Sequence, residues 1–124
     1  ALRDAGALLA LSSDWTVSTL NPFEIIETAI TRQPRKSADQ PAPFLPEQSL
    51  TLAECVEGYT INAAAAGWRA QETGSLSLGK YADLIVLDRD IYRCDPSDIG
   101  DTQVLLTLLS GKPVHATAPF CGQA

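Results

Sequence analysis

The stretch Gly74-Ser-Leu-Ser-Leu-Gly79-Lys80-Tyr81-Ala82-Asp83-Leu-Ile-Val-Leu-Asp88 decides how the chain is interpreted. Its first seven residues spell G-x-x-x-x-G-K, which is also the beginning of a phosphate-binding loop. Such a loop needs Ser or Thr after the lysine to hold magnesium, and a helix whose N-terminus holds phosphate. Here Tyr81 follows Lys80, and the apolar run 84–87 predicts a strand. The stretch is therefore interpreted as a glycine turn that leads into a buried strand.

The composition limits the classes of function. The chain has 124 residues, enough for one hydrophobic core, and its 45% hydrophobic and 19% charged residues are ordinary for a globular protein. A net charge of −6 disfavours nucleic acid as a partner, because phosphate backbones are repelled by an acidic surface. Apolar stretches stay shorter than the roughly 18 residues of a membrane helix, so no membrane partner is expected. The chain contains no Met, and it reads as a piece of something longer.

Cysteine and histidine are too few for a metal site in this chain alone. Cys55, Cys94 and Cys121 are widely spaced and odd in number, which predicts reduced thiols in a cytoplasmic setting. Without a C-x-x-C pair, a zinc site built on thiolates is not expected. His115 is the single histidine, and it is interpreted as a surface residue of a small sheet.

The N-terminal half predicts one β/α unit followed by two helices. The apolar run 7–11 predicts a strand buried on both faces, as in a parallel sheet, although its composition would also suit a helix. Asn21-Pro22-Phe23-Glu24 predicts a helix start, and Pro34 ends that helix, so residues 7–32 are predicted to form strand, loop and helix. Four prolines within 33–48 indicate a long surface loop. The capping box 51–54 then predicts a helix to about residue 61, with a second short helix over 62–66.

From Gly74 onward the pattern changes to strands. Strands are predicted over 84–87, 104–109 and 113–117, with a hairpin turn at 110–112, in an antiparallel or mixed sheet. Asp88-Arg89-Asp90 resembles the D-x-D of aspartyl-phosphate phosphatases, but too few residues follow for that fold. It is interpreted as a charged turn at a strand end.

Asp14 is the strongest candidate for chemistry. It directly follows the predicted strand 7–11, and in a barrel of β/α units the residues at the C-terminal ends of strands face the active site. A carboxylate there can bind a metal or take a proton from water. An Asp at this point of a chain also commonly caps a turn, and the residues alone leave both interpretations open. Trp15, which follows it, is interpreted as a packing residue.

Several segments together resemble one family, the metal-dependent amidohydrolases. The resemblance is to the amidohydrolase-3 type, which includes N-substituted formamide deformylases. It covers about residues 2–117, and its most specific part is G-S-L-x-x-G-K-x-A-D-L at 74–84. Weaker matches are Ser12-Ser13-Asp14-Trp15, Asn21-Pro22-Phe23, Thr31-Arg32, Leu50-Thr-Leu-Ala-Glu54, Tyr59-Thr60-Ile-Asn62-Ala63-Ala64 and Ser110-Gly111-Lys112-Pro113-Val114. Ser12 stands where the family commonly has Gly, and the family's H-x-H, its bridging lysine and its two later histidines do not occur in this chain.

The resemblance implies an α/β fold: the last β/α unit of a TIM-type barrel together with the C-terminal strands of a small β-sandwich, a composite domain built from both chain ends. On this basis residues 1–66 are expected to end the barrel, 67–118 to form sandwich strands, and 119–124 to be a tail. Asp14 is implied to be the carboxylate after the eighth barrel strand, which binds a metal or acts as general base toward the hydrolytic water.

The function that the resemblance implies is hydrolysis of non-peptide carbon–nitrogen bonds, with a divalent metal, expected to be zinc, in the full-length parent. The chain by itself is expected to be an inactive C-terminal fragment without bound metal. Its expected partners are the missing N-terminal part of its own barrel and a small-molecule substrate. The alternative is a non-catalytic assembly module that self-associates as a homo-oligomer through exposed barrel and sheet edges.

Overall fold

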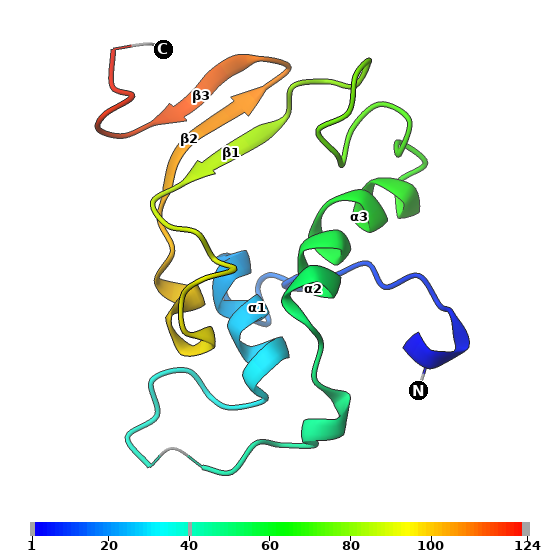
Figure 1. Ribbon diagram of the computed structural model, residues 1–124, viewed down its shortest axis with the longest axis vertical. Coiled ribbons are helices and arrows are strands. Elements are labelled where there is room, and N and C mark those ends of the chain that lie inside the picture. The colour runs from blue at the N-terminus through cyan, green and yellow to red at the C-terminus, as the bar shows by residue number, and fades with distance from the viewer. Residues whose placement is uncertain (1, 40, 123–124) are drawn as a thin grey trace.

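A computed structural model describes residues 2–39 and 41–122 and shows an α/β arrangement in which helices and strands are segregated along the chain (Figure 1). Three α-helices come first and a three-stranded sheet follows. The elements are α1 (Pro22–Thr31), α2 (Leu52–Tyr59), α3 (Ile61–Ala66), β1 (Leu84–Leu87), β2 (Val104–Leu109) and β3 (Lys112–Ala116). Three 3-10 helices accompany them: η1 (Arg3–Ala5), η2 (Pro46–Gln48) and η3 (Pro96–Asp101).

The predicted helix starts are confirmed in detail. The Asn21 side chain accepts a hydrogen bond from the Phe23 N–H at 3.0 Å, so it caps α1. Thr51 and Glu54 form the complete capping box of α2. α1 ends at Thr31, within one residue of the predicted end at 32, where Arg32 adopts a left-handed conformation (φ 56°). The second short helix is confirmed as α3, separated from α2 by a break at Thr60.

The buried strand predicted over 7–11 is wrong for this structure. The segment has no regular secondary structure, and Leu8 is 61% exposed. A strand of a parallel sheet needs strand neighbours, whereas the strands in the described part of the chain pair only with one another. The segment lies instead along the helices, where the Leu11 N–H donates to the Gly58 carbonyl at 3.0 Å. The β/α unit predicted over 7–32 therefore contains its helix and lacks its strand, and the TIM-type barrel stays a prediction.

The strands form one antiparallel sheet in the order β1-β2-β3, which excludes the mixed alternative. The predicted hairpin turn is confirmed, with Ser110 and Gly111 at φ 51° and 76°. β3 begins and ends one residue earlier than predicted, at Lys112–Ala116. Only one sheet is formed by the described residues, so the sandwich also stays a prediction. Of the expected tail 119–124, residues 123–124 lie outside the described residues.

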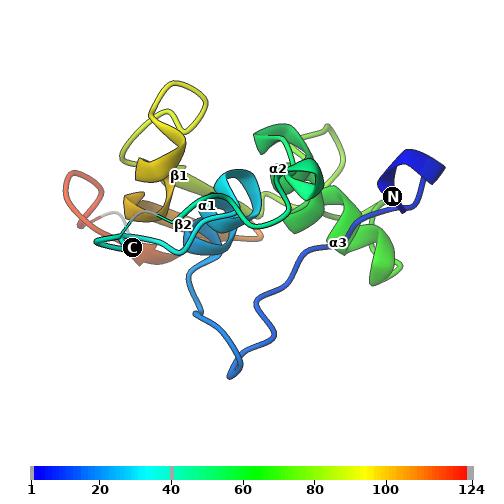
Figure 2. The same cartoon turned by 90° about the horizontal axis from the view of Figure 1, so that it is seen from below.

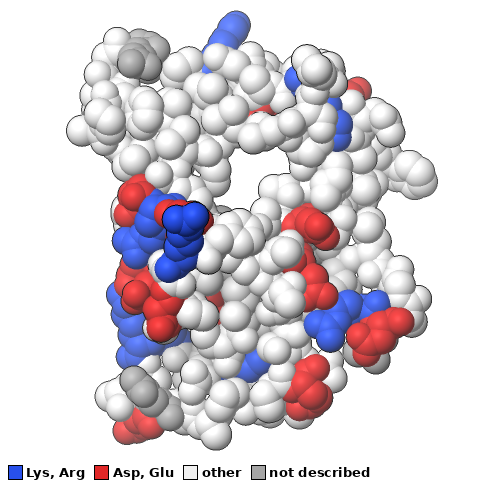
Figure 3. All heavy atoms as spheres, viewed as in Figure 1, with Lys and Arg blue, Asp and Glu red and all other residues white. Residues whose placement is uncertain are grey.

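The core lies between α1, α2 and η3, and Leu87 of β1 and Val104 of β2 pack against it. Its buried side chains are Phe23, Ile26, Cys55 and Ile99. The sheet is covered far less: Ile85 is 48% exposed and Val114 60% exposed. Figure 3 shows an opening through the molecule between the strands and the helices. The sheet therefore meets the core where Leu87 ends β1 and Val104 begins β2.

The segment 33–48 is a surface loop, as predicted, apart from the turn η2. The backbone of Arg32 and that of Phe44 close it, because the Phe44 N–H donates to the Arg32 carbonyl at 2.8 Å. Gln33 adds a bond from its amide nitrogen to the Pro41 carbonyl at 2.7 Å. Gln40 lies outside the described residues.

In the described part of the chain, none of the helices has both the length and the hydropathy that crossing a bilayer requires.

Candidate functional site

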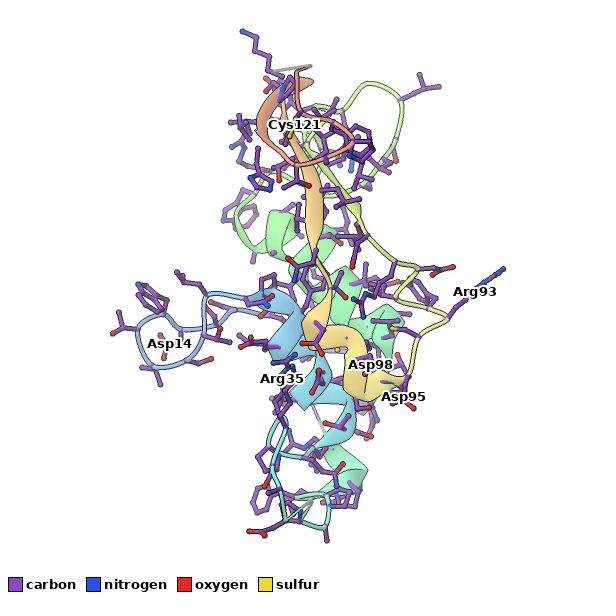
Figure 4. All side chains as sticks on the ribbon, turned by 90° about the vertical axis from the view of Figure 1, so that its left-hand side faces the viewer. Asp14, Arg35, Arg93, Asp95, Asp98 and Cys121 are labelled. Atoms are coloured by element: carbon purple, nitrogen blue, oxygen red, sulfur yellow. The ribbon has the colours of Figure 1, made fainter. Side chains whose placement is uncertain are left out.

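Asp14 lies on an exposed loop that projects away from the helices (Figures 2 and 4). Its backbone makes a turn: φ is 49°, its N–H donates to Ser12 Oγ at 3.3 Å, and its carbonyl accepts from the Val17 N–H at 2.7 Å. An Asp tolerates this left-handed conformation better than most residues. No donor among the described residues contacts its carboxylate. The main chain therefore builds the turn, and the carboxylate is left available to a ligand.

Ser12 accounts for part of this loop shape. A glycine, which is common in the family at this position, has no hydroxyl to accept the Asp14 N–H. The bond spans two residues, the geometry in which Ser side chains commonly close a turn. Ser12 therefore adds a hydrogen bond to the Asp14 backbone and leaves the Asp14 carboxylate without a partner among the described residues.

The loop that carries Asp14 also carries large apolar side chains that are exposed. Trp15 is 60% exposed, so a packing role would need a partner outside the described residues and stays a prediction. Val17 and Leu20 are 82% and 66% exposed. Large apolar side chains gathered around a carboxylate are typical of a surface that another part of a protein covers.

The described residues do not form a metal site. Among them there is no group of three or more His, Cys, Asp or Glu side chains that could hold an ion. Cys55, Cys94 and Cys121 are free thiols, and they are buried, half-buried and exposed respectively. His115 lies exposed in β3, as predicted, with its Nε2 3.2 Å from the Val104 carbonyl. Asp14 can supply one ligand, and a catalytic zinc typically takes three from protein.

The glycine signature is confirmed as an architectural turn. Gly74 and Gly79 adopt φ values of 86° and 88°, which glycine adopts without strain. The Lys80 ammonium is used inside the turn, where it donates to Ser75 Oγ at 2.7 Å and to the Thr73 carbonyl at 3.3 Å. Because a strand rather than a helix follows, no helix N-terminus is present to hold phosphate.

Asp83, within the same signature, joins the turn to the hairpin. Its Oδ2 accepts from Thr73 Oγ1 at 3.0 Å, and its Oδ1 accepts from the Ser110 N–H at 2.7 Å. A second contact runs parallel to this one, because the Gly111 N–H donates to the Ala82 carbonyl at 3.0 Å. The signature thus holds the β2–β3 turn against the start of β1.

Asp88 is confirmed as part of a charged turn at a strand end. Hydrogen bonds from Arg89 and from the Gln103 N–H lower the pKa of its carboxyl. Asp90 accepts from the Tyr92 N–H at 3.0 Å, which closes the next turn. These carboxylates are used by neighbouring donors and do not face a common pocket.

The structure also contains a cluster that the sequence did not reveal, which we call the α1–η3 ion cluster. It joins carboxylates of α1 and η3 to two basic residues of the 33–48 loop. Its members are Glu24, Glu27, Arg35, Lys36 and Asp101.

Glu27 is the centre of the ion cluster. It is only 4% exposed, and its Oε2 accepts from the Gly100 N–H at 2.8 Å and from Arg35 Nε at 3.3 Å. Asp101 pairs with Arg35 and, at 2.7 Å, with Lys36, and these bonds lower the pKa of the Asp101 carboxyl, the Lys36 bond most. Glu27, Lys36 and Asp101 line a surface cavity of about 490 Å³ beside η3. Glu24 and Arg35 of the cluster also line a second surface cavity, together with Ser18 and Thr19 of the loop that carries Asp14, and Figure 4 labels both Asp14 and Arg35. The spacing of Glu24 and Glu27 was the only local signal of the cluster.

With this geometry described, comparison with known proteins decides the family. A family model described as "Amidohydrolase family" matches residues 1–115, nearly the whole chain. The chain belongs to the amidohydrolase family.

Three relatives of this chain show that proteins with different names resemble it in sequence. The chain is 39% identical over 110 residues to the N-substituted formamide deformylase of Arthrobacter pascens, covering 89% of this chain and 20% of that protein. It is 34% identical over 114 residues to Protein LONG AFTER FAR-RED 3 of Arabidopsis thaliana, covering 92% and 19%. It is 34% identical over 109 residues to the imidazolonepropionase of Parabacteroides distasonis, covering 88% and 23%. The chain thus spans about a fifth of the length of these relatives, and no solved structure matches it significantly.

Proposed function

We propose that this chain is the C-terminal part of a metal-dependent amidohydrolase that cleaves non-peptide carbon–nitrogen bonds in amides, formamides, or cyclic amides and amidines. The observation that carries the proposal is the family match over residues 1–115, which includes Asp14. Two relatives bear names of such hydrolases, N-substituted formamide deformylase and imidazolonepropionase. The chain alone is incomplete as a catalyst in this proposal, since it supplies one candidate ligand where a site needs several.

Asp14 is the residue to which we assign the chemistry. When bound, a divalent metal of such a hydrolase, proposed to be zinc, activates water and polarises the group under attack. The role of Asp14 is to hold the proton released by that water and to return it to the leaving nitrogen, as general base and then general acid. Its exposed carboxylate, free of donors in the described residues, supports this role because a base engaged in a turn would be less available.

The N-terminal part of the same protein is the proposed partner, and the setting is proposed to be the cytoplasm. Exposed apolar side chains on the Asp14 loop support this partner, because they lack cover in the described structure. The free thiols of the described residues agree with a reducing compartment.

Formate release from N-benzylformamide by the full-length protein, loaded with zinc, tests the proposal. The Asp14→Asn variant keeps the size of the side chain and removes the base, and we expect kcat to fall by about 10²–10⁴-fold. The matched control is Asp39→Asn, which changes an exposed carboxylate of the 33–48 loop. Full activity in Asp14→Asn would show that the role is assigned to the wrong residue. Hydrolysis by the 124-residue chain alone would show that the chain is complete.

The second candidate is a non-catalytic module that self-associates. The observation in its favour is the sheet: β2 reads Val-Leu-Leu-Thr-Leu-Leu, apolar on both faces, yet its neighbours Ile85 and Val114 are about half exposed. Uncovered apolar faces and edges favour pairing with a second copy. Sedimentation velocity with metal analysis of the full-length protein separates the candidates, since a metal-free oligomer supports the module and stoichiometric zinc supports the site.

A further inference from the structure

Two hydrogen bonds attach the segment before Asp14 to the helices. The Leu11 N–H donates to the Gly58 carbonyl at 3.0 Å, and Asn62 Nδ2 donates to the Leu9 carbonyl at 3.1 Å. Residues 9 and 11 are two apart, so in an extended segment their polar groups lie on the same edge. One edge of the segment is therefore held at two successive positions, in the way that a neighbouring strand would hold it.

The end of α2 supplies the first of these contacts. Gly58 belongs to the last turn of α2, whose carbonyls have no partner within the helix. The segment can approach the helix because residue 58 has no side chain: a Cβ there would lie 2.7 Å from Leu11 Cγ and 3.3 Å from the Leu9 carbonyl oxygen. Gly58 thus offers a carbonyl that is free within the helix and the space for residues 9–11 to reach it.

Asn62 supplies the second contact, from the first turn of α3. The break at Thr60 (φ −119°, ψ −95°) separates the two helices, so the Asn62 side chain is presented beyond the end of α2. Because a carbonyl oxygen only accepts hydrogen bonds, the Leu9 contact requires the amide NH₂ of Asn62. A carboxylate of the same shape at position 62 would repel that carbonyl.

The location of Asp14 depends on this register. Asp14 is three residues beyond Leu11, which places it within roughly 10 Å of the held edge, at about 3.3 Å per extended residue. A slip by one residue would move it by about 3.3 Å and turn the side chains of the segment to opposite faces. In an enzyme, a displacement of about 1 Å can cost about 10²-fold in rate.

We propose that Asn62 is a positioning residue for Asp14: its amide fixes the register of residues 9–11 and so places the carboxylate at the reacting water. The inference rests on the proposed function, since it assigns Asn62 a part in the same reaction. Asn62 acts through Asp14 and does not itself contact the substrate.

A double-mutant cycle in the full-length, zinc-loaded protein tests this, with N-benzylformamide as the probe. Asn62→Ala is expected to lower kcat by about 10²-fold with KM little changed. In the Asp14→Asn background the same substitution is expected to change the residual rate by less than about threefold, because the group that it positions is already absent. Asn62→Asp, which cannot donate, should match Asn62→Ala.

Thr60→Ala is the matched control for damage to the helix pair. The Thr60 hydroxyl bonds to the Val56 carbonyl at 2.6 Å within its own turn and has no contact with residues 9–11. This variant should keep kcat. Equal losses from Asn62→Ala in both Asp14 backgrounds, or a loss in Thr60→Ala as large as in Asn62→Ala, would overturn the positioning role.

Hydrogen–deuterium exchange of the same proteins gives a readout that does not depend on activity. Asn62→Ala should speed exchange in peptides covering 9–16 by about tenfold or more, while Thr60→Ala leaves them unchanged. Unchanged exchange in Asn62→Ala overturns the inference. A wild-type protein without hydrolytic activity, or a fully active Asp14→Asn, overturns the proposed function instead. The positioning role of Asn62 in the reaction then falls with it, even if the exchange data show that Asn62 holds residues 9–11.

Discussion

Replacing Glu27 with alanine is expected to lower the free energy of unfolding by about 3 kcal/mol, the lower end of the range for breaking a buried ion pair. The side chain of Glu27 is 5% exposed, and its carboxylate accepts from both the Gly100 N–H and Arg35. Truncation leaves that N–H without a partner, a loss of about 1–3 kcal/mol by itself. The lower end applies because Arg35 is 20% exposed and keeps Asp101 as a partner.

Glu24 is the matched control, because it pairs with the same arginine from the same helix. Its distance to Arg35 is 3.7 Å and its side chain is 33% exposed. An ion pair that water reaches contributes less than about 1 kcal/mol, so Glu24→Ala should change stability by no more than that. Glu27→Gln should fall between the two, since it keeps an acceptor for the Gly100 N–H and removes the charge.

Urea unfolding followed by far-UV circular dichroism measures these differences, with the three variants compared at a common slope. The reasoning assigns the stability to burial rather than to the number of ion pairs. Equal losses from Glu27→Ala and Glu24→Ala, within about 0.5 kcal/mol, would refute it. A loss below about 1 kcal/mol for Glu27→Ala would show that the Gly100 N–H finds water instead.

Three further predictions concern the turns, the thiols and the response to acid. In the same urea assay, Gly74→Ala should lower the free energy of unfolding by about 2 kcal/mol or more, because its φ is 86° and a Cβ there would lie 2.7 Å from the methyl group of Ala64. Gly79→Ala, whose added Cβ would have no atom within 4 Å, should lower it by about 1 kcal/mol. An aromatic disulfide reagent at pH 8 should label exposed Cys121 rapidly and Cys55 only after denaturation, because burial raises the pKa of the Cys55 thiol to about 11; early labelling of Cys55 would contradict the buried core. The pKa of Asp101 is lowered in the folded state, so its contribution to stability is complete above the ordinary carboxyl pKa of about 3.9 and is lost as pH falls through the lower folded value. Asp101→Asn should therefore flatten that part of a profile of unfolding free energy against pH.

The features that could be predicted from the sequence are those decided by a few neighbouring residues. The caps at Asn21 and Thr51 act on N–H groups two and three positions away. The hairpin turn at Gly111 is likewise local, since it needs a positive φ between two apolar runs. Each of these contacts lies within a window that a sequence pattern covers, so the pattern and the structure agree.

The features that could not be predicted depend on partners far along the chain. The apolar run 7–11 indicates that the segment prefers burial, but it does not indicate which element the segment packs against. In this structure the segment contacts α2 and α3. Arg35 and Asp101 are 66 positions apart, and Asn62 and Leu9 are 53 apart. No local rule brings such pairs together, so the ion cluster and the anchor of the Asp14 loop were found only in three dimensions.

The most recognisable motif and the candidate chemistry are therefore separate for a physical reason. The glycine signature closes on itself: Lys80 and Asp83 satisfy the groups of the turn that contains them, and Asp83 also holds the turn at Ser110. Because the residues of this turn hold one another in place, many of its positions accept few residue types, and the sequence pattern is therefore specific. Asp14 has the opposite situation, because its carboxylate contacts no described residue and its placement is set from Asn62. The sequence around Asp14 therefore carries a weaker pattern than the glycine signature, and the described residues do not supply the contacts that would give the carboxylate its role.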